Sequence, residues 1–163
     1  MDEPLLQGRI DGRVAFEQGV RAFMAAAVTC GCPTLWLVDA DFARWPLGER
    51  DVVDAFAQWI GPRRRLVLMA ASFEQLRKRH PRWVRWHAPW VHGIECRLVH
   101  EDDRPRVHAL ALAPGHHALQ LADDLRCRGQ FVSDAMGLQA CAESVEALYA
   151  RSEAGLPVTT LGL

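Results

Sequence analysis

The sequence predicts a single α/β domain built on a mixed β-sheet that helices cover on both faces. Three observations support this class. The runs at residues 34–38 and 66–70 are apolar throughout, which is typical of strands that are buried on both faces. Segments with the period of amphipathic helices separate these runs. The chain of 163 residues, half of them apolar, has the size and composition of one globular domain.

The first elements alternate between helix and strand. Residues 1–10 form an N-terminal arm, and Asp11 is placed to cap a helix over residues 14–29. Gly31 ends this helix, since glycine tolerates the left-handed conformation that commonly follows a helix. A buried strand then covers residues 34–39. We therefore begin the main domain at residue 11 and continue it to residue 155.

A second helix–strand–helix unit follows after a loop. An amphipathic helix is predicted over residues 49–60, and a buried strand over residues 65–70. The tetrapeptide Ser72–Gln75 has the pattern of a capping box, so a helix is expected to begin at Ser72. Pro81 ends this helix and opens another at its first position.

The last part of the chain predicts a small antiparallel unit and a long helix. Strands are expected at residues 94–99, 107–112 and 117–121, and Pro114–His116 joins the last two as a hairpin turn. A helix covers residues 134–151. The tail, residues 156–163, has no charged side chain and four large apolar ones, so we expect it to dock on its own domain or on a partner subunit.

Composition and charge favour a cytoplasmic protein. The formal net charge is −1, which provides no global field to attract nucleic acid or an anionic membrane. The five cysteines are scattered, as free thiols are, and do not suggest a disulfide framework. The N-terminus has no signal-peptide pattern, and no apolar run approaches the ~20 residues that span a bilayer. Eighteen of the cationic side chains are arginine and one, Lys78, is lysine.

Short segments of the chain resemble a bacterial family of uncharacterised phospholipase-D-like half-domains. The segments are Gly12–Phe16, His80-Pro81-Arg82, Arg128–Val132 and Thr159–Leu163. The resemblance implies a phospholipase-D-like single half as the fold. It also implies a homodimer, because half-size members of that superfamily build one active site from two copies.

The chain departs from the active members of that superfamily at the catalytic motif. The motif is His-x-Lys-x4-Asp, and here His108 is followed by Leu110 in the lysine position and Gly115 in the aspartate position. The lysine would stabilise charge on the phosphoryl oxygens, and loss of such a group typically lowers the rate by ~10²–10³-fold. We therefore expect His108 to be a packed, hydrogen-bonded residue, and it is only a weak catalytic candidate.

Two further groups of residues are candidate binding sites. Trp83, Trp86 and Trp90 have helical spacing between arginines, which suits the protein core, a dimer interface or stacking on single-stranded nucleic acid. An interface is therefore expected to include Trp83, Trp86, Trp90, Leu161 and Leu163. An anion site is expected to draw on Ser72, Arg97, Arg126 and Arg128, with Ser72 at a helix N-terminus.

No metal site or cofactor is expected. Cys30-Gly31-Cys32 is too closely spaced for a zinc pair, and no second pair at ligand spacing accompanies it. The doublet Asp123-Asp124 is expected to be solvated. No glycine-rich phosphate loop is present.

These features lead to one main functional expectation and two alternatives. The main expectation is a catalytically degenerate phospholipase-D-like protein that acts as a binding or assembly module, with a homodimer or an unknown protein as partner. Nucleic acid ranks low among the expected partners. The first alternative is a phosphodiesterase or nuclease that uses His108 across a dimer axis. The second is a single-stranded nucleic-acid-binding module that uses residues 83–90.

Overall fold

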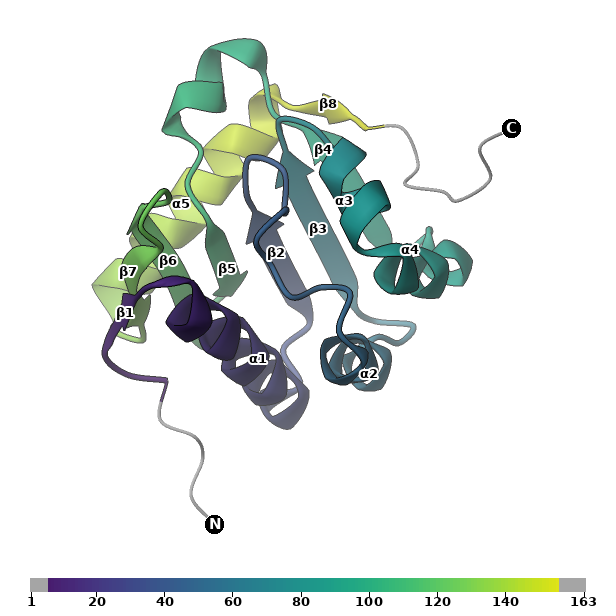
Figure 1. Cartoon of the computed structure of the whole chain (residues 1–163), viewed down its shortest axis with the longest axis horizontal. Helices are drawn as coiled ribbons and strands as arrows, with labels where there is room; N and C mark the ends of the chain where they lie inside the picture. The colour runs from purple at the N-terminus through teal and green to yellow at the C-terminus, as the bar shows by residue number, and fades with distance from the viewer. Residues whose placement is uncertain (1–5, 156–163) are drawn as a thin grey trace.

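The protein contains one open β-sheet of eight strands, in the order β1-β7-β6-β5-β2-β3-β4-β8 (Figure 1). The computed structural model describes residues 6–155. The strands are β1 (Arg9–Asp11), β2 (Thr34–Val38), β3 (Arg65–Ala70), β4 (Ile94–Leu98), β5 (Leu110–Ala113), β6 (His117–Asp123), β7 (Arg128–Val132) and β8 (Glu153–Ala154).

Helices cover both faces of this sheet, which confirms the predicted α/β class with a mixed sheet. Four helices lie on one face, and α5 alone lies on the other (Figure 1). The helices are α1 (Arg13–Cys30), α2 (Arg50–Trp59), α3 (Glu74–Arg79), α4 (Pro81–His87) and α5 (Ala135–Arg151). Two short 3₁₀ segments, η1 (Ala88–Trp90) and η2 (Glu101–Arg106), precede and follow β4.

The sheet has a parallel centre and antiparallel flanks. Strands β2, β3 and β4 run parallel, whereas β5, β6, β7 and β1 continue the sheet on one side as antiparallel neighbours. Strand β8 pairs with β4 on the other side, also antiparallel. The direction of the chain therefore reverses at the β2–β5 pair, where the carboxyl end of β2 lies beside the beginning of β5.

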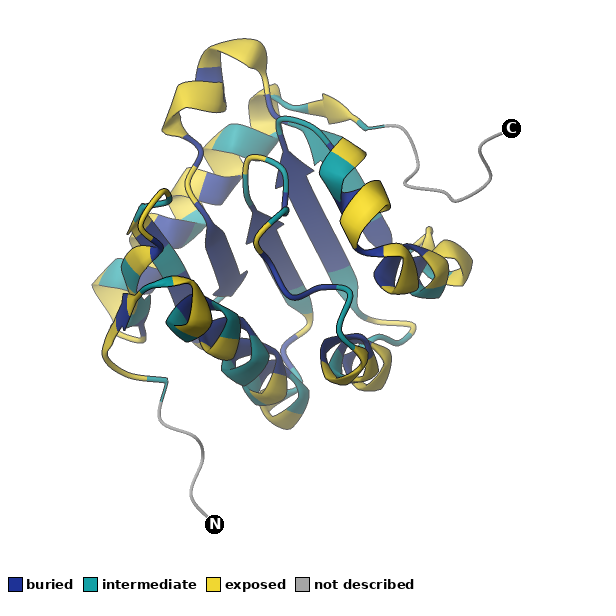
Figure 2. Ribbon diagram, viewed as in Figure 1, coloured by how far each residue is buried: buried dark blue, intermediate teal, exposed yellow. Residues whose placement is uncertain are grey.

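The apolar runs of the central strands supply two separate cores. Successive side chains of a strand point to opposite faces. In β3, Leu66 and Leu68 pack under α1–α4, while Val67 and Met69 pack on the side of α5. All four are fully buried, and most of β3 is in the buried class in Figure 2. This is why the sequence of β3 is apolar throughout and does not alternate.

Three strands differ from the expected organisation. Arg9 and Ile10 are not part of an arm, since they pair with β7 in the sheet. Strand β7 itself contains a glycine and two exposed polar residues, so its sequence has no strong strand pattern. Strand β8 has only two residues. All three lie at or next to the edges of the sheet, where fewer side chains are buried.

Two predicted helix caps are wrong. Asp11 does not cap α1: the N-cap is Gly12, and the Asp11 carboxylate accepts a hydrogen bond from Arg128. Helix α3 begins at Glu74 and not at Ser72, whose hydroxyl accepts a hydrogen bond from the backbone N–H of Glu74 at 3.3 Å. In both cases the residue with the expected capping side chain lies one position before the N-cap, which is Gly12 for α1 and Phe73 for α3.

The predicted tail, with Leu161 and Leu163, lies outside the described residues. Within residues 6–155, no helix is long and apolar enough to span a membrane. All five cysteines are free thiols. Burial raises the pKa of the Cys96 thiol to about 12.

Candidate functional site

Helices α3 and α4 carry the densest group of cationic side chains in the chain. Five of the residues between 77 and 85 are cationic and exposed: Arg77, Lys78, Arg79, Arg82 and Arg85. The two helices are joined at His80 and contact each other (Figure 1). We refer to these five side chains as the α3–α4 basic surface.

The amphipathic sequence of the two helices places the cations outside. Leu76 of α3, and Trp83, Val84 and His87 of α4, are buried in the core under the sheet. Positions three and four apart lie on the same side of a helix, so the remaining positions face solvent. The basic surface is therefore the outer side of the helices whose inner side forms part of the core.

Trp83 belongs to the core and not to an interface. Its side chain has no exposed surface, and its ring stacks on His87 with centroids 4.9 Å apart. Phe56 of α2 packs against it at 6.2 Å. The prediction of Trp83 as a contact for a partner is wrong, because a ring buried at this depth is not available to a base or to a second subunit. Trp86 and Trp90 are half-buried and pack against the same core.

His80 fixes the junction of the two helices to the loop after β2. Its Nδ1 accepts a hydrogen bond from the backbone N–H of Gly48 at 3.1 Å, and its Nε2 lies 2.8 Å from the carbonyl oxygen of Phe42. The neutral imidazole with the proton on Nε2 satisfies both contacts. Burial, with a smaller contribution from the nearby Arg79 charge, lowers the pKa of His80.

The α3–α4 basic surface is not neutralised by acidic neighbours. Within residues 6–155, none of its five cations forms an ion pair. Arg79 donates to Gln75, and Arg82 donates to the Gly48 carbonyl. Residues 74–87 contain one carboxylate, Glu74, and so carry a net charge of +4, which leaves −5 on the rest of the chain. The overall charge of −1 therefore conceals a local positive patch.

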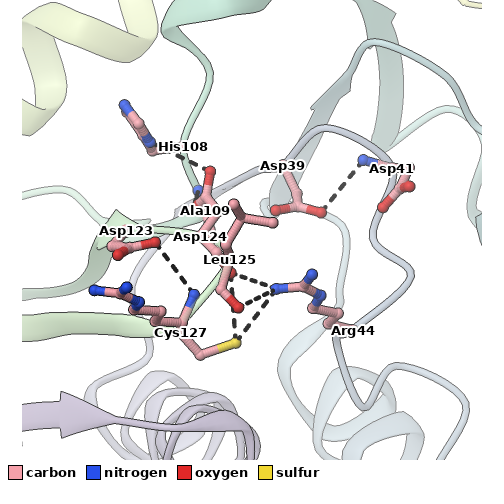
Figure 3. A network of polar contacts seen from close by, with 10 residues as sticks. Asp39, Asp41, Arg44, His108, Ala109, Asp123, Asp124, Leu125 and Cys127 are labelled. Atoms are coloured by element: carbon pink, nitrogen blue, oxygen red, sulfur yellow. Dashed lines mark hydrogen bonds and ion pairs between the residues drawn. The ribbon is translucent and has the colours of Figure 1, made fainter.

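His108 lies at a second location, at the edge of the sheet where β2 ends and β5 begins. It precedes β5, and its side chain is 53% exposed, so the expectation of a packed histidine is wrong. The Asp124 carboxylate lies 3.2 Å from Nδ1 of His108 and accepts a hydrogen bond from the Ala109 backbone N–H at 3.1 Å (Figure 3). Asp124 therefore has two structural partners, His108 and Ala109. The expectation that Asp124 is simply solvated is wrong.

Arg44 and Asp39 fix the loops around this edge. The Arg44 guanidinium donates to the carbonyl oxygens of Asp124 and Leu125, and so ties the loop after β2 to the turn before β7 (Figure 3). The Asp39 carboxylate accepts hydrogen bonds from the backbone N–H groups of Phe42 at 2.7 Å and Asp41 at 3.3 Å. Burial raises the pKa of Asp39, and these two hydrogen bonds partly oppose that effect.

The four residues of the predicted anion site do not meet. Arg97 of β4 donates to Ser152 and its guanidinium lies 4.8 Å from the centre of the Tyr149 ring. Arg128 of β7 is five strand positions away, or about 24 Å at the usual spacing of strands. Arg126 lies in the turn before β7, and Ser72 follows β3. One anion cannot bind all four residues.

The basic surface was only partly visible in the sequence. The arginines between the tryptophans indicate that the helix has one exposed and one buried side, but the spacing of Trp83, Trp86 and Trp90 does not show which residues face solvent. In the structure Leu76 and Trp83 are buried, so the cationic side chains are the ones that face solvent. Within the described residues, no group of three or more His, Cys, Asp or Glu side chains is placed to hold a metal ion.

Comparison with known proteins finds similarity at the level of the fold. No protein-family model matches the chain, and no curated protein is similar to it in sequence. The structure is similar to that of TrmBL2, an archaeal chromatin protein for which a novel mode of DNA binding has been described, with a TM-score of 0.62 and 12% identity. The match covers 91% of this chain and 54% of TrmBL2, so the chain corresponds to about half of that protein.

This similarity contradicts the main functional expectation. A catalytically degenerate phospholipase-D-like binding or assembly module was expected, and nucleic acid was ranked low as a partner. The structurally similar protein is instead a chromatin protein that binds DNA. The alternative of nucleic-acid binding is therefore better supported than the main expectation, although residues 83–90 cannot act in the way first considered, because Trp83 is buried.

Proposed function

We propose that the protein binds nucleic acid through phosphate contacts made by the α3–α4 basic surface. The observation that carries this proposal is that five exposed cations on two adjoining helices have no acidic partner among the described residues. When arginine and lysine side chains of this kind contact phosphates, the counterions condensed on the nucleic acid are released. This release supplies most of the affinity of non-specific binding.

The character of the surface suits the sugar–phosphate backbone better than base edges or stacked bases. Four of its five cations are arginines, and the planar guanidinium group of an arginine can bind two oxygens of one phosphate at the same time. Its aromatic residues, by contrast, point into the core or are half-buried. Phosphate contacts carry no sequence information. The proposal is therefore binding with little sequence preference.

The likeness to TrmBL2 supports the same function. That protein is described as a chromatin protein and binds DNA. Because this chain matches about half of it at 12% identity, the likeness adds weight at the level of the fold, and the basic surface supplies the argument from residues.

We also infer that the sheet and its helices belong to the phospholipase-D-like half-domain fold. The order of elements supports this inference: helix and strand alternate from α1 to β4, antiparallel strands follow, and α5 closes the domain. This is an assignment of fold alone and implies no catalysis.

The proposal is tested by fluorescence anisotropy with a labelled duplex of two helical turns and a single strand of the same length. The affinity of the wild-type protein is expected to fall with salt, with a slope of about −0.9 per phosphate contacted on duplex DNA. The variant Arg77→Glu/Arg85→Glu is expected to weaken binding by about tenfold or more and to reduce the slope by about 2. Neither side chain makes a hydrogen bond to the described residues, so the fold should be retained.

The matched control is Arg104→Glu/Arg126→Glu. These two arginines are also exposed and lie away from α3 and α4. The control variant has the same net charge as the Arg77→Glu/Arg85→Glu variant. Wild-type affinity is expected for this control. Equal losses in both double variants would mean that overall charge and not this surface binds nucleic acid, and absence of binding by the wild-type protein at low salt would refute the function itself.

A further inference from the structure

A cavity of about 680 Å³ lies on the other face of the sheet, between α5 and the strands β5, β6, β7 and β1. Its apolar wall includes Val38, Leu110 and Leu148. The size is within the range of ~300–1,000 Å³ that is usual for small-molecule sites. The α3–α4 basic surface lies over the opposite face, so the cavity is not part of the proposed nucleic-acid interface.

The polar part of the cavity is entirely cationic or neutral. Arg9, Arg106 and Arg128 line it from β1, η2 and β7, and no carboxylate is among the described residues that line it. Arg128 is paired with Asp11 at 3.1 Å, but both of these side chains are more than half exposed, so the pair is weak and exchangeable. Arg9 and Arg106 form no ion pair with any residue of 6–155.

The pairing of β1 with β7 brings two of these arginines together. Asp11 lies opposite Arg128, and Arg9 lies opposite Gln130. Residues two apart in a strand point to the same face, so Arg9 and Arg128 lie on the same side of the sheet. The cavity therefore depends on β1 and β7, two of the three strands that the sequence does not predict.

His108 adds an imidazole to the three guanidinium groups of the cavity. The Asp124 carboxylate accepts the hydrogen bond from Nδ1 of His108, which fixes the proton on that nitrogen and leaves Nε2 for another partner. Leu110, two residues further on, forms part of the apolar wall. An imidazole, three guanidinium groups and an apolar wall thus surround one space.

We propose that this cavity binds a small organic phosphate, with the phosphate among Arg9, Arg106 and Arg128 and the apolar body against Val38, Leu110 and Leu148. Three guanidinium groups, of which only Arg128 has a carboxylate partner and that one in an exposed, exchangeable pair, match a doubly charged anion. The apolar wall selects a ligand with an organic body over inorganic phosphate. His108 is assigned to positioning of the ligand through Nε2.

The test uses phenylphosphonate as the probe, with inorganic phosphate as a control for its anionic group and benzyl alcohol as a control for its aromatic ring. Binding is measured by calorimetry and by amide chemical shifts of the full-length protein. Phenylphosphonate should bind more tightly than either control, and its binding should shift amide resonances of β1, β7 and η2. Arg106→Gln should weaken its binding by about tenfold or more, because a charge-assisted hydrogen bond is lost.

Two further variants complete the test. Arg104→Gln changes an exposed arginine that lies two residues away and outside the cavity, and should leave binding unchanged. Ser144→Trp, at an exposed lining position of α5, should fill the space and abolish binding without change of charge. The proposal is refuted if phenylphosphonate does not bind, if inorganic phosphate or benzyl alcohol binds equally well, or if Arg106→Gln and Ser144→Trp bind as the wild-type protein does.

Discussion

Trp83 shows how one residue determines which side of α4 meets solvent. The indole is fully buried between Phe56, Trp86 and His87, and its neighbours Arg82 and Arg85 are exposed as a consequence. Its Nε1 is a buried donor without a partner in the described part of the chain. Packing alone therefore holds the ring, and packing alone should account for the effects of its replacement.

We expect Trp83→Ala to lower the free energy of unfolding by about 3–5 kcal/mol, the usual cost of removing a large buried aromatic side chain. Denaturant unfolding measures this loss. Trp90→Ala, at a half-buried position, should cost less. A Trp83→Ala protein that is as stable as the wild type but has lost affinity for single-stranded DNA would show that the indole stacks on bases, contrary to its position in the structure.

His80 links the basic surface to the pH of the solution. Burial lowers its pKa, and burial also lowers the pKa of His87 in the same core. The folded protein then binds fewer protons than the unfolded chain at pH values below the ordinary histidine pKa of about 6.5. The contribution of these two neutral, buried histidines to the free energy of unfolding should therefore be fully present above that pH. It should decrease as the pH falls through their lowered pKa values in the folded state.

Thermal or denaturant unfolding between neutral and mildly acidic pH tests this expectation. The free energy of unfolding should decrease towards acidic pH, and His80→Gln should show a smaller decrease because one of the two imidazoles with a lowered pKa, those of His80 and His87, is gone. His92→Gln, which replaces an exposed histidine, is the control for the loss of one imidazole from the chain. An identical pH dependence in His80→Gln and wild type would mean that His80 does not titrate as its environment requires.

At the scale of elements, burial decides what the sequence can predict. Strands β2, β3 and β5 are buried on both faces, so their apolar runs identify them directly. The edge strands β1 and β8 have exposed side chains and carry almost no pattern. The basic surface follows from the helical period once the buried side of α4 is known. The cavity could not be predicted, because it depends on the pairing of β1 with β7, which is set by distant segments.

Gly129 shows why β7 is difficult to identify from sequence. It lies opposite Leu121 at an irregularity of the β6–β7 pair, and a Cβ at this position would overlap the carbonyl oxygen of Gln120. Gly129→Ala should therefore separate the two strands and lower the free energy of unfolding by at least about 1–3 kcal/mol. Gly61→Ala is the control, since its Cβ would meet only Arg64 at 3.8 Å. Equal stability of the two variants would contradict the close approach of β6 and β7.

For the whole molecule, the two proposed cationic binding sites lie on opposite faces of one sheet. The four-helix face carries the α3–α4 basic surface, and the α5 face carries the arginine-lined cavity. The sheet between them is buried on both sides, so it forms a rigid spacer. The two proposed ligands, nucleic acid and a small organic phosphate, would therefore bind without competing for the same residues.

The homodimer stays a prediction from sequence. Of the residues expected at its interface, Trp83 is excluded by burial, and Trp86 and Trp90 retain partial exposure. Sedimentation equilibrium at micromolar concentration should show a species of twice the 18.3 kDa chain mass. Trp90→Asp should shift it towards monomer, because a charge would be placed in an apolar contact. A wild-type protein that sediments only as monomer would contradict the prediction.

The measurement that tests the central claim most directly is an amide chemical-shift titration of the protein with a short DNA duplex at low salt. Binding through the α3–α4 basic surface predicts that the largest shifts fall on residues 74–87 and that added salt reverses them. The resonances of α5 and η2 should stay unchanged. Largest shifts on the α5 face, or no shifts at any DNA concentration, would contradict the account.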